Sequence, residues 1–116
     1  MRAPLLFCLA LALIAQPGAD LTQALNSSRQ RIDSIDGQIV KLLNERAQVV
    51  REVGLIKKQY HAPASAPGRE EQVVRRAARQ ARAPLTPSAM EAIYKVILQE
   101  MSSMEATEML KEPKVP

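Results

Sequence analysis

The chain has 116 residues, enough for one domain, with a net charge of +4, 47% apolar residues and only 3% aromatic residues. This composition favours a helical core of aliphatic side chains over a sandwich of short strands. Cys8, the single cysteine, lies in an N-terminal segment that we expect to be removed. A mature chain without cysteine could have neither a disulfide-built fold nor a cysteine metal site. The net positive charge is compatible with binding an anionic small molecule, a nucleic acid or a membrane surface, and does not discriminate between these partners.

Residues 1–19 have the pattern of a signal peptide. Arg2 supplies a positive start, and the apolar run from Leu5 to Ala15 is too short to span a bilayer. Pro17-Gly18 interrupts this run, and we predict cleavage after Ala19. The mature protein would be periplasmic or secreted and would not remain at the membrane. The alternative is an uncleaved N-terminal anchor.

The next segment predicts one long amphipathic helix from Leu21 to Tyr60, because its apolar residues recur at steps of three and four. A helix of this length extends roughly 60 Å, whereas a compact domain of this size is only about 30 Å across. The rest of the chain cannot cover such a helix, so we expect a second copy to pack on it, as in a helical homodimer. The apolar stripe comprises Leu21, Leu25, Ile32, Ile35, Ile39, Leu42, Val49, Val53, Ile56 and Tyr60.

A loop is predicted over residues 61–68, which contain two prolines and a glycine, followed by a second helix from Arg69 to about Arg82. Valine and alanine residues supply the apolar face of that helix. Its basic stripe is typical of a solvated face, and nucleic-acid binding would lack stacking aromatic side chains. The apolar positions are Val73, Val74, Ala77, Ala78 and Ala81, and the basic ones are Arg75, Arg79 and Arg82.

Thr86-Pro87 predicts the start of a third helix, since threonine caps a helix and proline is tolerated in the first turn. This helix should run to about Leu110. The domain would then cover residues 20–112, with a flexible tail at 113–116. The predicted fold class is therefore all-α, with one long and two shorter helices per chain in an intertwined homodimer. The buried stripe of the third helix comprises Met90, Ile93, Tyr94, Ile97, Leu98 and Met101.

Three cationic residues of the first helix are placed to bind a small dianion. Arg46 and Lys57 are eleven residues apart and fall within roughly 20° of each other on the helix surface. Arg29 lies roughly 100° away and about 25 Å along the axis from Arg46. A single helix cannot direct all three at one ligand, whereas two copies can, which predicts a site shared between subunits.

Each of these cations also has a purely structural interpretation. Arg46 lies within an apolar stripe, where an unpaired guanidinium is costly, so it could pair with a buried glutamate of another helix. The functional interpretation leaves it free to bind a carboxylate with two parallel hydrogen bonds. Taken alone, Lys57 could extend along the surface to solvent and Arg29 could be an ordinary surface residue.

The order of these residues resembles the all-helical (type II) chorismate mutases over roughly residues 21–108. That family forms an intertwined homodimer of three helices per chain and rearranges chorismate to prephenate, without a metal or other cofactor. The matching segments are Arg29-x-x-Ile32-x-x-x-Asp36, Leu42-Leu43-x-Glu45-Arg46, Val53-Gly54-x-x-Lys57 and Arg69-Glu70.

The resemblance implies a role for each matching residue. Arg29 of the partner subunit and Arg46 would hold the two carboxylates, and Lys57 would point at the ether oxygen whose bond breaks. Glu70 would accept a hydrogen bond from the ring hydroxyl, and Arg69 would support this network. Val50 and Val53 would form the wall of the pocket.

Three positions depart from the family pattern. Ala66 replaces an acidic residue of the loop, and the ungapped register places Met101 where helix three often carries a serine, unless Ser102 or Ser103 substitutes. Glu105 falls where the family commonly has a glutamine that donates to the ether oxygen. We therefore hypothesise that Glu105 works in its protonated form. The alternative is an exposed residue in the last turn.

Two other functions remain open. An isochorismate pyruvate lyase on the same scaffold would keep the three cations of the first helix, although Glu70 and the twelve-residue gap from Lys57 to Arg69 favour the mutase. A non-enzymatic exported helical binding module would give no reason for Arg46 and Lys57 to share an apolar face. The expected partners are a dicarboxylate substrate and a second copy of the chain, not nucleic acid.

Overall fold

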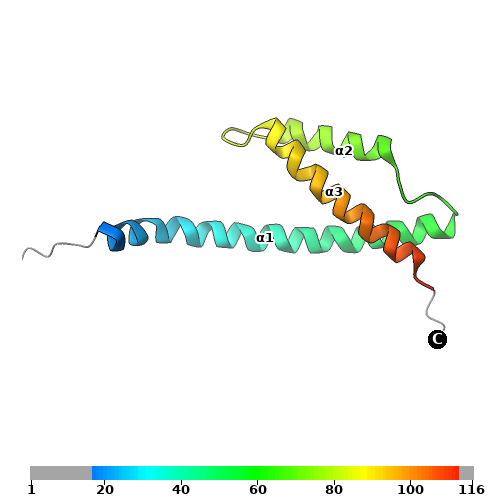
Figure 1. Cartoon of the computed structure of the whole chain (residues 1–116), viewed down its shortest axis with the longest axis horizontal. Helices are drawn as coiled ribbons and strands as arrows, with labels where there is room; N and C mark the ends of the chain where they lie inside the picture. Colours follow the sequence, from blue (N-terminus) through cyan, green and yellow to red (C-terminus); the bar gives the residue numbers. More distant parts are fainter. Residues whose placement is uncertain (1–16, 113–116) are drawn as a thin grey trace, which may run out of the picture. The chain divides into compact units, whose positions relative to one another are not determined.

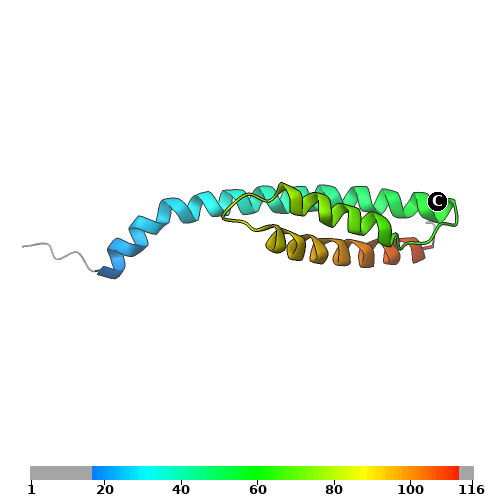
Figure 2. The ribbon, with the colours of Figure 1, turned by 90° about the horizontal axis from the view of Figure 1, so that it is seen from above.

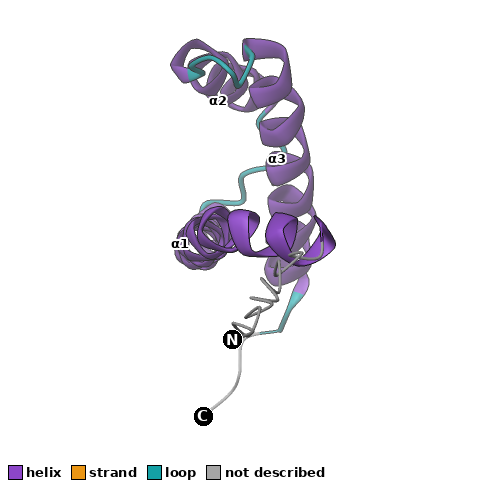
Figure 3. Cartoon of the chain, turned by 90° about the vertical axis from the view of Figure 1, so that its left-hand side faces the viewer, coloured by secondary structure: helices purple, strands orange, loops and turns teal. Residues whose placement is uncertain are grey.

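The computed structural model describes residues 17–112 and has three helices, α1 (Pro17–Gln59), α2 (Pro67–Gln80) and α3 (Pro87–Leu110) (Figure 1). All regular secondary structure in this described range is helical (Figure 3). The predicted all-α class, with one long and two shorter helices, is confirmed. Most of the expected signal segment and all of the expected tail lie outside the described residues.

The bounds of α1 and α2 differ from the predictions. Helix α1 begins at Pro17 and not at Leu21, and α2 begins at Pro67 and not at Arg69. Proline is well suited to a first helical turn, because the backbone N–H that it lacks would have no partner there. Pro67 therefore lies in the first turn of α2 and not in the preceding loop, where the sequence placed it. Helix α2 also ends earlier than predicted, at Gln80.

The start of α3 follows the prediction. Thr86 is its N-cap, in an extended conformation, and its hydroxyl accepts a hydrogen bond from the backbone N–H of Ala89 at 3.1 Å. Pro87 occupies the first turn, and the helix ends at Leu110 as expected. The cap satisfies one of the free donors at the helix end.

The chain divides into two compact units, one ending at Ile39 and the other starting at Val40. In the first unit, the described residues are the N-terminal part of α1. The second unit contains the remainder of α1 together with α2 and α3. Helices α2 and α3 pack against each other (Figure 2), and the alanine and valine face predicted for α2 is buried at Val74 and Ala77.

In this second unit, the C-terminal part of α3 packs on the C-terminal part of α1, and Gly54 is buried where they approach. Charged groups join the same two ends. Arg51 is paired with Glu108 at 3.3 Å, and Lys58 donates a hydrogen bond to the backbone carbonyl of Lys111. These contacts determine which residues of α3 face α1.

Large apolar side chains remain exposed along α1 in the single chain. Leu21 is 61% exposed, Leu42 is 62% exposed and Val49 is 55% exposed. Ile93 of α3, predicted to be buried, is also 48% exposed. The sequence assigns these residues to apolar stripes, and within the second unit the exposure of Leu42, Val49 and Ile93 means that the packed helices leave parts of these stripes uncovered.

No helix of the described residues is long and apolar enough to cross a membrane. Within residues 17–112, histidine, cysteine and acidic residues form no cluster that could hold a metal ion.

Candidate functional site

A cavity of about 290 Å³ lies between α1, α2 and α3 in the second unit. It brings together seven of the eight residues that the sequence singled out. From α1 come Arg46, Val50, Val53 and Lys57, from α2 come Arg69 and Glu70, and from α3 comes Glu105.

Arg46 brings an unsatisfied hydrogen-bond donor to this cavity. Its Nη1 atom is buried and has no hydrogen-bond partner among residues 17–112. A buried donor without an acceptor costs roughly 1–3 kcal/mol. The alternative in which Arg46 pairs with a buried glutamate is therefore not seen in the single chain, and the guanidinium is available for an anion that enters the cavity.

Lys57 follows Arg46 by eleven residues, about three turns of α1, and lies within reach of two acceptors. Its Nζ atom is 2.5 Å from Oε1 of Glu105 and donates a hydrogen bond to the backbone carbonyl of Ala64 at 2.8 Å. The lysine side chain is only 21% exposed, so it does not simply extend into solvent.

The loop after α1 brings the Ala64 carbonyl to Lys57. His61 adopts a left-handed conformation, with φ of 54°, and its backbone N–H bonds to the carbonyl of Lys58. The N–H of Ala62 bonds to the carbonyl of Lys57 at 2.8 Å. This pair of bonds is the Schellman arrangement, which ends the helix and turns the chain back over its last turn.

Glu105 is buried, with 7% of the residue exposed, so it is not the exposed last-turn residue that was the alternative. Its contact with Lys57 is an ion pair whose angles lie outside those of a hydrogen bond, and Oε1 has no hydrogen-bond donor within residues 17–112. The carboxyl group and the ammonium group are therefore next to each other on the cavity wall, with hydrogen-bonding capacity left at both.

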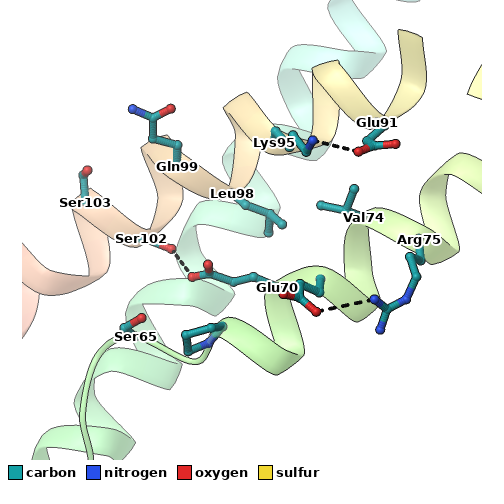
Figure 4. Close-up of a pocket in the computed structure, with 12 residues that line it drawn as sticks. Ser65, Glu70, Val74, Arg75, Glu91, Lys95, Leu98, Gln99, Ser102 and Ser103 are labelled. Atoms are coloured by element: carbon teal, nitrogen blue, oxygen red, sulfur yellow. Dashed lines mark hydrogen bonds and ion pairs between the residues drawn. The ribbon is translucent and has the colours of Figure 1, made fainter. Parts of the chain in front are cut away.

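Glu70 is held across the α2–α3 contact by a serine. The hydroxyl of Ser102 donates to Oε1 of Glu70 at 3.0 Å, as the dashed line in Figure 4 shows. The ungapped register placed Met101 here unless Ser102 or Ser103 substituted, and the hydrogen bond to Glu70 comes from Ser102. Met101 and Ser102 both line the cavity, but the serine is the residue that bonds to the glutamate. Adjacent helical residues differ by about 100° in direction, so a register error of one residue exchanges the two.

Arg69 lines the cavity, and its Nη1 atom donates to Gln72 of the same helix at 2.9 Å. Among the described residues, no hydrogen bond or ion pair joins Arg69 to Glu70, whose Oε1 atom accepts from Ser102. Ala66, which replaces an acidic residue of the family pattern, also lines the cavity.

Arg29 is not part of this cavity. It is an exposed residue of α1 in the first unit. This agrees with the helical phase, which separates Arg29 from Arg46 and Lys57 along one helix.

A larger cavity of about 760 Å³ lies between α2 and α3, next to the Glu70–Ser102 bond (Figure 4). Both cations that line it are already ion-paired on their own helices. Lys95 pairs with Glu91 at 2.7 Å, and Arg75 pairs with Glu71 at 3.5 Å. For a dianionic ligand the smaller cavity is the better candidate, because its cations include a buried one without a partner.

The fold and the site together define a small all-helical protein with a cavity lined by cationic side chains. Comparison with known proteins identifies its family. The model of the chorismate mutase type II family matches residues 28–106, and the chain belongs to that family.

Two relatives illustrate the similarity. A bifunctional chorismate mutase/prephenate dehydratase of Aquifex aeolicus (strain VF5) is 39% identical over 51 residues, which are 44% of this chain and 14% of that protein. This chain thus matches only a small part of the relative's length. The crystal structure of chorismate mutase from Helicobacter pylori in complex with prephenate has a TM-score of 0.71 at 20% identity. It covers 78% of this chain and 99% of that one, and the likeness shows the shared fold.

Proposed function

We propose that this chain is a chorismate mutase, an isomerase that rearranges chorismate to prephenate. The observation that carries the proposal is the Arg46 guanidinium, whose Nη1 atom is buried and has no hydrogen-bond partner in the described chain. Arg46 lines the same cavity as Lys57 and Glu105. An arginine in this state favours a carboxylate ligand, which accepts two parallel hydrogen bonds from it.

The residues of the cavity match what such a reaction requires. The rearrangement is a one-molecule pericyclic shift, in which one carbon–oxygen bond breaks as a carbon–carbon bond forms. A protein accelerates it by holding the flexible side chain over the ring and by placing donors where negative charge develops on the ether oxygen. Charged side chains and the apolar walls at Val50 and Val53 can do both.

Each polar residue then has a role. Arg46 and Arg29 of the partner subunit bind the two carboxylates. Lys57 donates to the ether oxygen, and Glu105, which forms an ion pair with Lys57 in the free protein, donates to it from α3 once it is protonated. Glu70, oriented by Ser102, accepts a hydrogen bond from the ring hydroxyl. Arg69 lies at the edge of this network.

We also propose that the active form is a homodimer with shared sites. The exposed apolar residues of α1 support this arrangement, since a second copy of the same helix would cover them. Arg29 is exposed in the single chain, and the resemblance to the family assigns it to the site of the partner subunit, which supports a site completed by a second copy.

Turnover tests the reaction. Purified protein starting at Asp20 is mixed with chorismate, and prephenate is measured. We expect prephenate to form, and we expect Arg46→Ala to abolish turnover while the protein remains a dimer. A folded protein that leaves chorismate unchanged would reject the proposal. Ligand binding that survives in Arg46→Ala would favour a non-enzymatic binding module.

The same preparation discriminates between the mutase and the lyase. Isochorismate is supplied in place of chorismate, and salicylate and pyruvate are measured. Release of salicylate at a rate above that of prephenate formation would identify the chain as an isochorismate pyruvate lyase.

A mixing experiment tests the shared site. Arg29→Ala and Arg46→Ala are each inactive alone if both arginines hold substrate. In a mixed dimer, one site receives both intact arginines and the other receives neither, so random mixing restores about a quarter of wild-type activity. Activity that stays at zero after subunit exchange, with mixed dimers demonstrated by mass, would reject the shared site.

Export is a further part of the proposal and rests on the pattern of residues 1–19. Mass spectrometry of the protein recovered outside the cytoplasm would give its first residue, which we expect to be Asp20. Recovery of the protein only inside the cytoplasm, starting at Met1, would reject export.

A further inference from the structure

Gly54 is a glycine in the interior of a helix, where this residue is normally unfavourable. Glycine destabilises a helix relative to alanine because its backbone loses more conformational freedom. Gly18 and Gly37, the other glycines of α1, have no atom within 4 Å of the place where a Cβ atom would be. Gly54 differs from both.

A Cβ atom at Gly54 would lie 3.1 Å from Cγ of Glu105 and 3.5 Å from both the Glu105 carbonyl oxygen and Cγ of Met109. The contact with Cγ is tighter than ordinary van der Waals contact, so Glu105 would have to move by a few tenths of an ångström. The other two distances are ordinary contacts.

Glu105 has little room for that movement. Its carboxylate lies 2.5 Å from Nζ of Lys57, and Lys57 is itself bonded to the carbonyl of Ala64. The side chain therefore lies between the bare backbone of Gly54 on one side and Lys57 on the other. Displacement at Cγ moves the carboxyl group relative to the lysine.

We propose that Gly54 is a positioning residue, which acts by letting Glu105 lie against Lys57 in the cavity. The inference rests on the proposed rearrangement, because Glu105 and Lys57 are the groups assigned to the ether oxygen. Gly54 does not touch the substrate. A residue that only packs helices together would change stability in the same way whether or not Glu105 is present.

Four proteins test this role: the wild type, Gly54→Ala, Glu105→Ala and the double variant. Their kcat and KM for chorismate are measured, together with helicity and thermal stability. Gly37→Ala is the matched control, since it makes the same change on the same helix with nothing nearby. Wild-type turnover is measured first, and its absence rejects the proposed function and not the packing at Gly54.

We expect Gly54→Ala to lower kcat about tenfold with KM changed less than about threefold, because small displacements of catalytic groups are costly. Gly37→Ala should keep the wild-type kcat. In the Glu105→Ala background the Cγ atom is gone, so Gly54→Ala should have no further effect on the residual rate. An equal loss in both backgrounds, or no loss in either, overturns the inference.

The experiment still decides the question if a variant fails to fold. If Gly54→Ala alone fails to fold, the double variant decides. A folded double variant with the rate of Glu105→Ala supports the contact with Glu105 as the cause. A double variant that also fails to fold overturns it, because the clash would then be with the helix backbone or with Met109.

Discussion

Replacing Arg46 by methionine should remove activity without loss of stability. In the free protein Nη1 of Arg46 is buried and has no acceptor within the described chain, which costs roughly 1–3 kcal/mol. Methionine keeps much of the apolar volume of the side chain and removes this buried donor. We therefore expect the free energy of unfolding to stay equal or to rise by up to about 2 kcal/mol.

The same substitution should greatly lower kcat/KM, although it leaves the free energy of unfolding equal or higher. Two charge-assisted hydrogen bonds to a substrate carboxylate contribute about 1.5–3 kcal/mol each, so their loss should lower kcat/KM roughly 10²- to 10⁴-fold. Arg76→Met is the matched control, because Arg76 is exposed on α2 and does not line the cavity. This control should leave kcat/KM and the free energy of unfolding near the wild-type values.

Chorismate consumption measures kcat/KM, and urea unfolding at fixed protein concentration measures the free energy of unfolding. A variant that loses more than about 1 kcal/mol of stability while it keeps its kcat/KM would refute the reasoning. That result would mean that Arg46 is a structural cation.

Three other outcomes follow from the geometry. If Glu105 donates in its protonated form, Glu105→Gln keeps a donor at the same place and should retain most of the wild-type rate, whereas Glu105→Ala should not; a glutamine variant as slow as the alanine variant rejects the hypothesis. The hydrogen bond from Lys111 lowers the pKa of Glu108, so its stabilisation is complete above the unfolded value near 4.5 and is lost as the pH falls through the folded pKa. Glu108→Gln should consequently show a smaller loss of unfolding free energy between neutral and acidic pH than the wild type, and an equal loss would contradict this. His61→Gly should raise the unfolding free energy by about 1 kcal/mol, because glycine adopts the left-handed conformation without strain; a lower melting temperature would argue against strain at His61.

The helical phase of α1 could be predicted because its apolar residues mark one period over many turns. The same phase placed Arg46 and Lys57 on one face, and both line one cavity. It also separated Arg29 from them, and Arg29 lies outside that cavity.

The register of α3 was harder to predict, because long-range contacts determine it. Nothing local distinguishes Met101 from Ser102, and the choice depends on Glu70, which is 32 residues away along the chain. The burial of Glu105 likewise depends on the close approach at Gly54. The signal that could have revealed this approach is the glycine itself, which has no local reason to occur in the helix.

The exposed aliphatic side chains of α1 make dilution a direct test of the proposed homodimer. If two copies bury these side chains against each other, mass action links folding to concentration, and the melting temperature should rise as more protein is added. Specific activity should also fall once the copies separate, since each would then lack the other's arginine. A short peptide that copies the first turns of α1 would compete for the same surface and would inhibit assembly without resembling the substrate.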